Sequence, residues 1–123
     1  MTDQVQYLVE FTIIDEKTEE FKSLIHSLIE KVKKNEPGID SYQLFYNSGD
    51  NKSYMLERFP NSAGVMAHLA HVGPMLPDLL ELAPITRFEI FGNISNELAE
   101  SLSSLGPDIY SYLNGFNRAK TPA

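Results

Sequence analysis

The order in which two kinds of hydrophobic spacing follow one another restricts the fold of this chain more than any other feature of its sequence. Apolar residues recur at every second position, as in strands with one buried face, in four segments: 5–14, 39–46, 52–59 and 85–94. Between the first two segments, and again between the last two, they recur at three- and four-residue steps, as in amphipathic helices. The predicted order is therefore strand, helix, strand, strand, helix, strand. This order is typical of a ferredoxin-like α+β fold (βαββαβ), an antiparallel four-stranded sheet with helices on one face.

Capping and turn residues mark the ends of these segments. Asp15 is predicted to cap the first helix, and Asn61 or Ser62 the second. Residues 47–51 are a run of turn formers, which predicts a hairpin between the two central strand segments. A short helical segment is predicted for residues 75–82, after Gly-Pro breaks the second helix.

The chain is predicted to consist of a ferredoxin-like domain at residues 1–94 and a C-terminal helical extension at residues 95–123. Ser95 or Asn96 can cap the helix of this extension. Residues 108–113 are too apolar for a loose end, whereas the last residues are expected to be flexible.

One face of the predicted sheet cannot be covered by the helices. We assign the most apolar set of alternating residues to the covered face: Tyr7, Val9, Phe11, Ile13, Tyr42, Leu44, Tyr54, Leu56, Phe88 and Ile90. The other face then carries large apolar groups among polar ones: Leu8, Ile14, Phe45, Met55, Phe59, Ile85 and Phe91, with Glu10, Gln43, Glu57, Arg87 and Glu89. A soluble monomer seldom exposes an apolar patch of that size. We therefore expect a homodimer that buries two such faces together, a dimeric α/β barrel.

Charges in such an interface would have to be paired, Arg87 with Glu57 or Glu89. The alternative is that the C-terminal tail folds back over this face within one chain. The tail residues Tyr110, Tyr112 and Phe116 could also form a lid over a pocket, but we expect them to dock on the partner subunit.

Composition excludes several classes of partner. The formal net charge is −7 and the basic residues are not clustered, so neither nucleic acid nor an anionic membrane is an expected partner. The chain has no cysteine, no signal-peptide pattern at its start and no apolar run of the roughly 20 residues that a membrane helix needs. We expect a cytoplasmic protein. Phosphate-loop, nucleophile-elbow and Gly-x-Gly-x-x-Gly motifs are missing, and no cofactor is expected.

Two stretches of the sequence resemble the antibiotic biosynthesis monooxygenase family. They are EPGIDSYQLFYN at 36–47 and YMLERFPNSAGVMAHLAH at 54–71, and a Gly-Asn pair follows at 92–93 where the last strand ends. The resemblance covers residues 5–94 and includes the order of elements. It implies a dimeric ferredoxin-like barrel with a hydrophobic pocket between sheet and helices. It also implies a reaction in which a polyphenolic substrate itself activates oxygen, helped by Trp, Asn, Tyr and Arg groups.

The chain departs from that family pattern at most of these positions. Phe59 stands where the family has Trp, Met55 where the best-known monooxygenases have Asn, and Val65 near their Tyr. Only Arg87 matches the basic group of the pattern. Since the chain contains no Trp, the haem-degrading branch of the family is not expected.

The candidate catalytic residues are His68 and Arg87. His68 matches the family's helix histidine, and an imidazole can accept or donate a proton near neutral pH. Its structural alternative is a hydrogen bond to the neighbouring loop. Arg87 could stabilise a phenolate or enolate, or it could instead form the interface ion pair with Glu57.

Six further residues are predicted to contact a substrate. Asn61 would otherwise cap its helix, and Tyr54 is the tyrosine expected to leave the core for the pocket. His71 lies one turn after His68, but this pair has no convincing third ligand, so no metal site is predicted. The full set comprises Tyr54, Phe59, Asn61, Val65, Glu57 and His71.

These features favour a cofactor-independent monooxygenase that acts on a small aromatic or quinol-like substrate with molecular oxygen. Two alternatives remain open at this point. One is a non-catalytic dimeric binding module for a small hydrophobic ligand. The other is an isomerase or decarboxylase on the same barrel, which would need only an acid–base pair.

Overall fold

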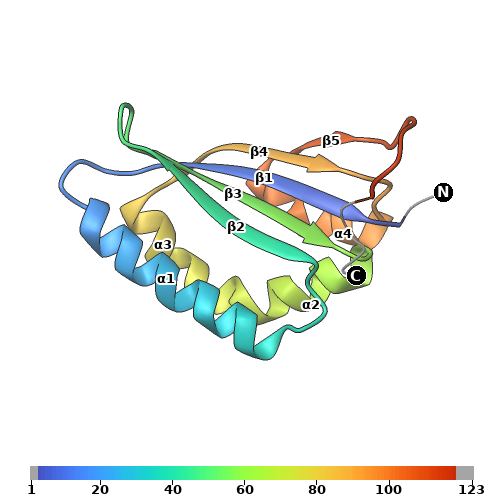
Figure 1. The fold of residues 1–123 in the computed structure, drawn as a ribbon, viewed down its shortest axis with the longest axis horizontal. Helices are drawn as coiled ribbons and strands as arrows, with labels where there is room; N and C mark the ends of the chain where they lie inside the picture. The colour runs from blue at the N-terminus through green and yellow to red at the C-terminus, as the bar shows by residue number, and fades with distance from the viewer. Residues whose placement is uncertain (1–2, 119–123) are drawn as a thin grey trace.

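The computed structural model describes residues 3–118 and consists of two layers, a sheet and the helices packed against it (Figure 1). The predicted order of strands and helices is confirmed. The elements are β1 (Val5–Thr12), α1 (Thr18–Asn35), β2 (Ser41–Asn47), β3 (Lys52–Phe59), α2 (Ser62–Val72), a 3-10 turn (Gly73–Met75), α3 (Leu76–Leu82), β4 (Ile85–Phe91), α4 (Asn96–Leu102), a second 3-10 turn (Ser103–Leu105) and β5 (Asp108–Tyr110).

The sheet has the strand order β2-β3-β1-β4-β5. The first four strands pair antiparallel, as predicted, but β5 adds to the edge parallel to β4. The sheet is therefore mixed rather than purely antiparallel. The reason is that α4 crosses over between β4 and β5, and such a crossover returns the chain in the same direction.

The helices α1 and α2 each bury one stripe of side chains against the sheet. In α1 the buried residues follow three- and four-residue steps: Phe21, Ile25, Leu28 and Val32. Lys17 occupies the N-cap position of α1, so the predicted cap at Asp15 is wrong; Glu16, in a left-handed conformation, makes the turn between the two. In α2 the Asn61 side chain does cap the helix, accepting a hydrogen bond from the Gly64 N–H at 2.8 Å.

The predicted facing of β3 is wrong. Ser53, Met55, Glu57 and Phe59 are the residues buried beneath the helices, whereas Tyr54 and Leu56 lie on the open face. Both alternating sets of β3 contain apolar residues, so hydropathy alone cannot select between them. The pairing with β1 decides which set faces the helices, because Val9 lies opposite Met55 and cross-strand partners share a face.

The prediction for Ile85 is wrong for a related reason. A register shift between Glu10 and Phe11 places Ile85 opposite Phe11 and packs it against the core. The predicted ion pair of Glu57 with Arg87 is also wrong. Glu57 faces the helices, while Arg87 lies on the open face and pairs with Glu89.

The open face of the sheet keeps its apolar side chains exposed. Phe45 is 50% exposed, Leu56 39% and Phe91 40%. Up to residue 118, the tail leaves these three side chains uncovered. It adds β5 at the edge, where Tyr110 stacks on Phe91 with a ring separation of 5.1 Å.

The segment after β4 contributes to the same core as the rest of the chain. Leu98 and Leu102 of α4 are almost completely buried. The expectation of a flexible end falls partly on residues 119–123, which lie outside the described residues. Within residues 3–118, no helix is long and apolar enough to cross a membrane.

Gly92, directly after β4, is a position where only glycine fits. Its φ is +146°, and a Cβ built there would lie 2.6 Å from the carbonyl oxygen of Gln4. We predict that Gly92→Ala lowers the free energy of unfolding by about 1–3 kcal/mol, through backbone strain and this contact. Gly73→Ala is the matched control, because a Cβ there meets nothing within 4 Å. Urea unfolding of both variants checks the prediction, and equal stabilities would contradict it.

Candidate functional site

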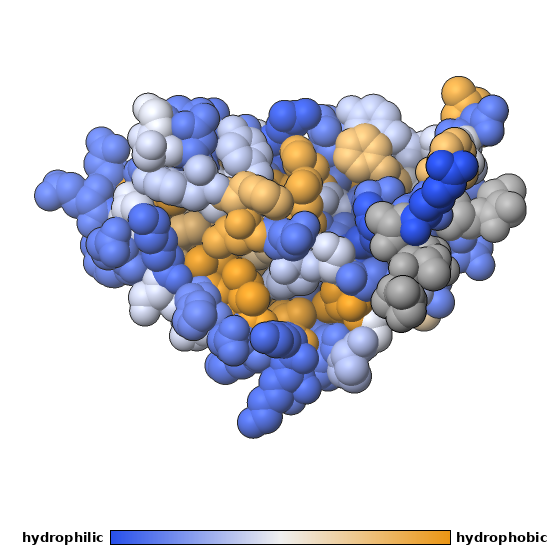
Figure 2. All heavy atoms as spheres, in the orientation of Figure 1, coloured by the Kyte–Doolittle hydropathy of each residue, from blue (hydrophilic) through white to orange (hydrophobic). Residues whose placement is uncertain are grey.

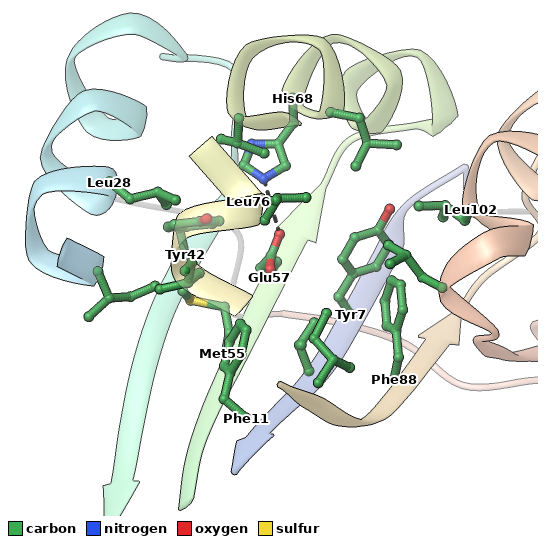
Figure 3. A pocket seen from close by; sticks show the side chains of 17 residues that line it. Tyr7, Phe11, Leu28, Tyr42, Met55, Glu57, His68, Leu76, Phe88 and Leu102 are labelled. Atoms are coloured by element: carbon green, nitrogen blue, oxygen red, sulfur yellow. Dashed lines mark ion pairs between the residues drawn. The ribbon is translucent and has the colours of Figure 1, made fainter. Parts of the chain in front are cut away.

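A cavity of about 60 Å³ lies between the sheet and the helices (Figure 3). Most of its wall is apolar. The lining residues are Tyr7, Val9, Phe11, Ile25, Leu28, Tyr42, Met55, Glu57, His68, Leu69, Val72, Leu76, Leu79, Ile85, Phe88, Leu102 and Leu105. On the molecular surface, hydrophobic atoms gather between α1 and the edge strand β2 (Figure 2), and these two elements supply Ile25, Leu28 and Tyr42 of the wall.

The floor of the cavity carries a row of polar side chains. Glu57 on β3 lies directly opposite Tyr42 on β2 and Tyr7 on β1. Directly opposite partners point to the same face, with Cβ atoms about 4.5–5.5 Å apart. Three neighbouring strands therefore present a phenol, a carboxyl and a second phenol in line beneath the helices (Figure 3).

His68 of α2 forms the roof above this row. It is 3% exposed, and its ring packs against Tyr42 and Phe59 with ring separations of 5.3 Å to each. Its Nδ1 lies 2.9 Å from Oε1 of Glu36, the residue at the C-terminal end of α1. The other oxygen of Glu36 is hydrogen-bonded to Nδ1 of His71, one turn further along α2.

These contacts fix the proton of His68. The Glu36 carboxylate can only accept hydrogen bonds, so Nδ1 of His68 must carry the hydrogen. The lone pair of the neutral imidazole is then on Nε2, which lies 3.5 Å from Oε1 of Glu57. That separation is within ion-pair reach, but its geometry does not make a hydrogen bond, and Glu57 Oε1 has no hydrogen-bonding partner among residues 3–118. The basic nitrogen of His68 therefore faces the cavity.

Burial determines the protonation of the site. Removal from water, reinforced by the charge of Glu36, raises the pKa of Glu57 to about 8. Burial also lowers the pKa of His68, and the hydrogen bond that His68 donates to Glu36 opposes this effect. Burial raises the pKa of Tyr7 well above its usual range. At pH 7 the site therefore contains a neutral imidazole and a neutral Glu57 carboxyl.

The structure brings together only some of the predicted site residues. His68 and Glu57 line the cavity, and Phe59 and His71 contact His68 or its partner Glu36. The others are placed elsewhere: Val65 is buried but outside the cavity wall, Asn61 caps α2, and Tyr54 and Arg87 belong to the opposite face of the sheet. No group of three or more His, Asp or Glu residues within 3–118 is arranged to hold a metal ion.

The sequence prediction missed three residues of the site: Glu36, Tyr7 and Tyr42. Glu36 stands in the Glu-Pro-Gly stretch quoted for the family resemblance, and a carboxylate directly after a helix is a signal that could have been used. The two tyrosines were assigned to the covered face as core residues, and nothing in their spacing distinguishes a cavity wall from a filled core.

Comparison with known proteins places the chain in a family. A sequence model described as antibiotic biosynthesis monooxygenase matches residues 6–73, more than half of the chain. No curated protein sequence matches closely enough to count as a relative.

Several solved structures share the fold. MupZ from Pseudomonas fluorescens superposes with a TM-score of 0.85 at 24% identity, over 100% of this chain and 95% of that one. SnoaB from Streptomyces nogalater, a cofactor-independent oxygenase, gives a TM-score of 0.62 at 19% identity, over 77% of this chain and 97% of that one. A conserved protein from Methanosarcina mazei gives 0.61 at 24% identity, over 71% and 87%. At these identities the likeness concerns the fold alone.

The buried carboxyl of Glu57 should make stability fall as pH rises. The folded protein keeps this proton up to about pH 8, whereas the unfolded chain loses it near the usual value of 4.5. The folded state therefore binds the extra proton within this window, and its advantage is lost as pH rises through it. Glu57→Gln cannot ionise at this position. We predict that the free energy of unfolding of Glu57→Gln, minus that of the wild type, increases by about 1–3 kcal/mol between pH 5 and pH 9, so that the variant is the more stable protein at pH 9.

Urea unfolding at pH 5, 7 and 9 measures this effect. Glu30→Gln, which removes an exposed carboxyl on α1, is the control and should follow the wild type. If Glu57→Gln and wild type keep a constant difference across the three pH values, Glu57 is not held neutral by the fold.

Proposed function

The chain belongs to the antibiotic biosynthesis monooxygenase family, and we propose that it is a cofactor-independent monooxygenase acting on a small aromatic or quinol-like substrate with molecular oxygen. The observation that carries this proposal is the hydrogen bond from His68 Nδ1 to Glu36, 2.9 Å long, which leaves the basic Nε2 facing an apolar cavity. A base oriented by a carboxylate and shielded from water is suited to proton abstraction.

His68 would act on the substrate before oxygen does. Its Nε2 accepts the proton of an acidic hydroxyl, and Glu36 stabilises the imidazolium that forms. The resulting anion donates electrons to oxygen more readily than the neutral substrate does. One oxygen atom then enters the substrate and the other leaves as water, with the substrate itself supplying the electrons.

The size of the cavity limits how the substrate enters. A cavity of roughly 150 Å³ accommodates a benzene ring, whereas this one measures about 60 Å³. The reacting hydroxyl end of a substrate fits beside His68, and a whole ring enters only if surrounding side chains move apart. The apolar surface between α1 and β2 would hold the remainder of the substrate (Figure 2).

Arg87 has no place in this chemistry within one chain, because it lies on the opposite face of the sheet from His68. We propose instead that it belongs to a homodimer interface formed by the open face. The exposed apolar groups Phe45, Leu56 and Phe91 supply a reason for this face to be covered.

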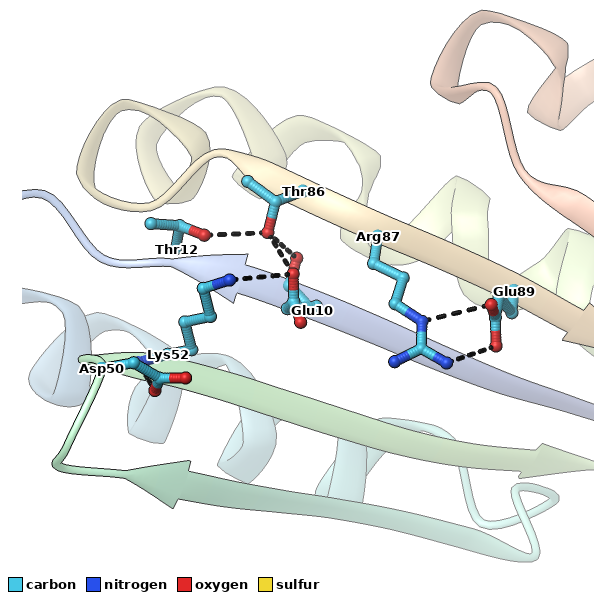
Figure 4. Close-up of polar contacts among 7 residues, drawn as sticks. All are labelled: Glu10, Thr12, Asp50, Lys52, Thr86, Arg87 and Glu89. Carbon is cyan, nitrogen blue, oxygen red and sulfur yellow. Dashed lines mark hydrogen bonds and ion pairs between the residues drawn. The ribbon is translucent and has the colours of Figure 1, made fainter.

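Four charges of that face, those of Glu10, Lys52, Arg87 and Glu89, are paired within the chain (Figure 4), whereas Arg58 donates a 3.4 Å hydrogen bond to Gln6. Arg87 makes two hydrogen bonds of 3.1 Å to Glu89, and Glu10 accepts a 2.7 Å hydrogen bond from Thr86 and lies 3.7 Å from Lys52. The hydrogen bond from Thr86 lowers the pKa of Glu10. Paired charges lose less on burial than isolated ones, which supports an interface between two copies of this face.

A second function fits the same base. His68 lies between the carboxylate of Glu36 and the neutral carboxyl of Glu57, at 2.9 Å and 3.5 Å. A base and an acid side by side can move a proton within a substrate, so an isomerase or decarboxylase would need nothing further. Dependence on oxygen separates the two functions.

We predict that the protein consumes oxygen with at least one member of a panel of hydroquinones and polyketide-like phenols. His68→Ala should lower this rate by about 100-fold or more, because general-base catalysis contributes roughly that factor. The control is His26→Ala, which changes an exposed histidine on α1 and should leave the rate unchanged. Binding without turnover across the panel would contradict the monooxygenase and leave a binding module.

The pH dependence gives a further check on the base. The rate should fall as acid protonates His68, at a pH below 6.5 because burial lowers its pKa. Glu36→Gln removes a group that raises the pKa of His68, so it should shift this limb to still lower pH and reduce the rate. If the acidic limb of the pH–rate profile does not shift in Glu36→Gln, Glu36 has no part in orienting the base.

We predict that Leu56→Lys weakens the dimer, since it adds a charge to the centre of the proposed interface. Ile109→Lys is the control, because Ile109 is similarly exposed but pairs with the core residue Ile90 on the other face. Sedimentation at micromolar concentration should give twice 13.9 kDa for the wild type and the control, and a smaller mass for Leu56→Lys. A wild-type particle of 13.9 kDa would refute the dimer.

A further inference from the structure

We propose that Tyr7 and Glu57 form a carbonyl-binding subsite, at which both donate hydrogen bonds to one substrate oxygen while His68 removes a proton from the adjacent carbon. The substrate class is then a small carbonyl compound with an acidic α-hydrogen, including the keto form of a phenol. This inference rests on the proposed function, because it uses the same base, and it names the chemical group that the base acts on.

The first observation is that two buried polar atoms in the cavity have no partner in the part of the chain that the structure describes. The Tyr7 hydroxyl and Glu57 Oε1 are both fully buried and make no hydrogen bond to any of residues 3–118. A buried polar group without a partner costs about 1–3 kcal/mol. A ligand oxygen that accepts from both groups would recover that free energy, so these two atoms mark where a ligand is favoured.

The second observation is their arrangement. Tyr7 and Glu57 are direct cross-strand partners on β1 and β3, so their side chains rise together from the floor of the cavity. Nε2 of His68 lies above, 3.5 Å from Oε1 of Glu57 (Figure 3). An oxygen bound by the two floor groups brings its neighbouring carbon beneath the imidazole.

The third observation is that both floor groups can donate. Burial raises the pKa of Glu57 to about 8 and that of Tyr7 further above its usual range, so both carry their proton at pH 7. The ionisable groups facing Glu57 are Tyr7 and Tyr42 on the neighbouring strands and His68 above it, with the charge of Glu36 behind His68. The negative charge of the Glu36 carboxylate favours the neutral form of Glu57.

The proton transfer balances without any added reactant. The lone pair on Nε2 of His68 forms an N–H bond, and the α-carbon loses its hydrogen. The electrons of that C–H bond form a carbon–carbon double bond, and the negative charge moves to the oxygen held by Tyr7 and Glu57. Donors placed where charge develops stabilise such an enolate. Return of a proton from His68 to carbon completes a cycle that needs no oxygen.

The volume of the cavity agrees with this assignment. The cavity of about 60 Å³ is smaller than the roughly 150 Å³ that accommodates a benzene ring. That space suits a carbonyl group and its α-carbon, and a ring enters only if surrounding side chains move apart.

Hydrogen–deuterium exchange in the absence of oxygen tests the subsite. Acetone, butanone and cyclopentanone are incubated with the protein in D₂O under nitrogen, and the loss of α-hydrogen is followed by proton NMR. We expect exchange above the buffer rate for the wild type. Tyr7→Phe should reduce it by about 100-fold, the loss typical for one oxyanion donor.

A lower exchange rate in Tyr7→Phe can be assigned to the lost hydroxyl only if the variant remains folded. This variant removes only an unpaired buried hydroxyl, so it should fold and be at least as stable as the wild type. Tyr46→Phe is the matched control, because Tyr46 is 42% exposed and bonds Asn51 away from the cavity. Its exchange rate should equal that of the wild type.

The outcomes separate this inference from the proposed function. Exchange that depends on Tyr7, together with no oxygen uptake from phenols, supports the subsite and refutes the monooxygenase. Oxygen uptake that depends on His68 while Tyr7→Phe retains full exchange and uptake refutes the subsite alone. No exchange above buffer with any of the three ketones also overturns the subsite, whatever the oxygen assay gives.

Discussion

The two hydrogen bonds that Glu36 accepts from His68 and His71 connect the end of α1 to α2. They do this inside a layer that is otherwise apolar, where an unpaired carboxylate would be strongly unfavourable. The same contacts decide which nitrogen of His68 keeps its hydrogen and which faces the cavity. The packing of two helices and the chemistry of the site therefore depend on one carboxylate. The two hydrogen bonds account for a carboxylate at this partly buried position.

The two faces of the sheet carry different kinds of polar group. The face under the helices holds neutral polar groups, Tyr42, Glu57 and Tyr7, in a row across three strands. The open face holds the paired charges Lys52–Glu10 and Arg87–Glu89, with apolar side chains between them. Neutral donors suit a water-poor cavity, whereas paired charges beside apolar groups suit an interface. Because successive side chains of a strand point to opposite faces, neighbouring residues of the same strand lie in these two different environments.

The fold could be predicted from the sequence, but the candidate site could be predicted only in part. The six-element order follows from spacing and turn residues, which act locally, and all six elements were found at the expected places. His68, which the structure places in the cavity wall, was also chosen as a candidate. Its contacts were not predicted, because Glu36 and Glu57 are 32 and 11 residues away along the chain, and their contact depends on how α2 crosses the sheet. Glu57 and Glu89 were both predicted as possible partners of Arg87, and the structure shows Glu89. Only the register shows that Glu57 and Arg87 face opposite sides of the sheet.

The sequence by itself determined the class of fold, the excess of apolar surface on the sheet and the presence of a histidine on the second helix. Local periodicity and capping are sufficient for these, since each depends on residues within a few positions of one another. The tertiary structure alone decided which alternate residues of β3 point inward, and with them the protonation of the site. When both alternating sets of a strand contain apolar residues, its hydropathy does not define which set is buried. In β3 the pairing with β1 defines it, and Glu57 is therefore buried beneath His68.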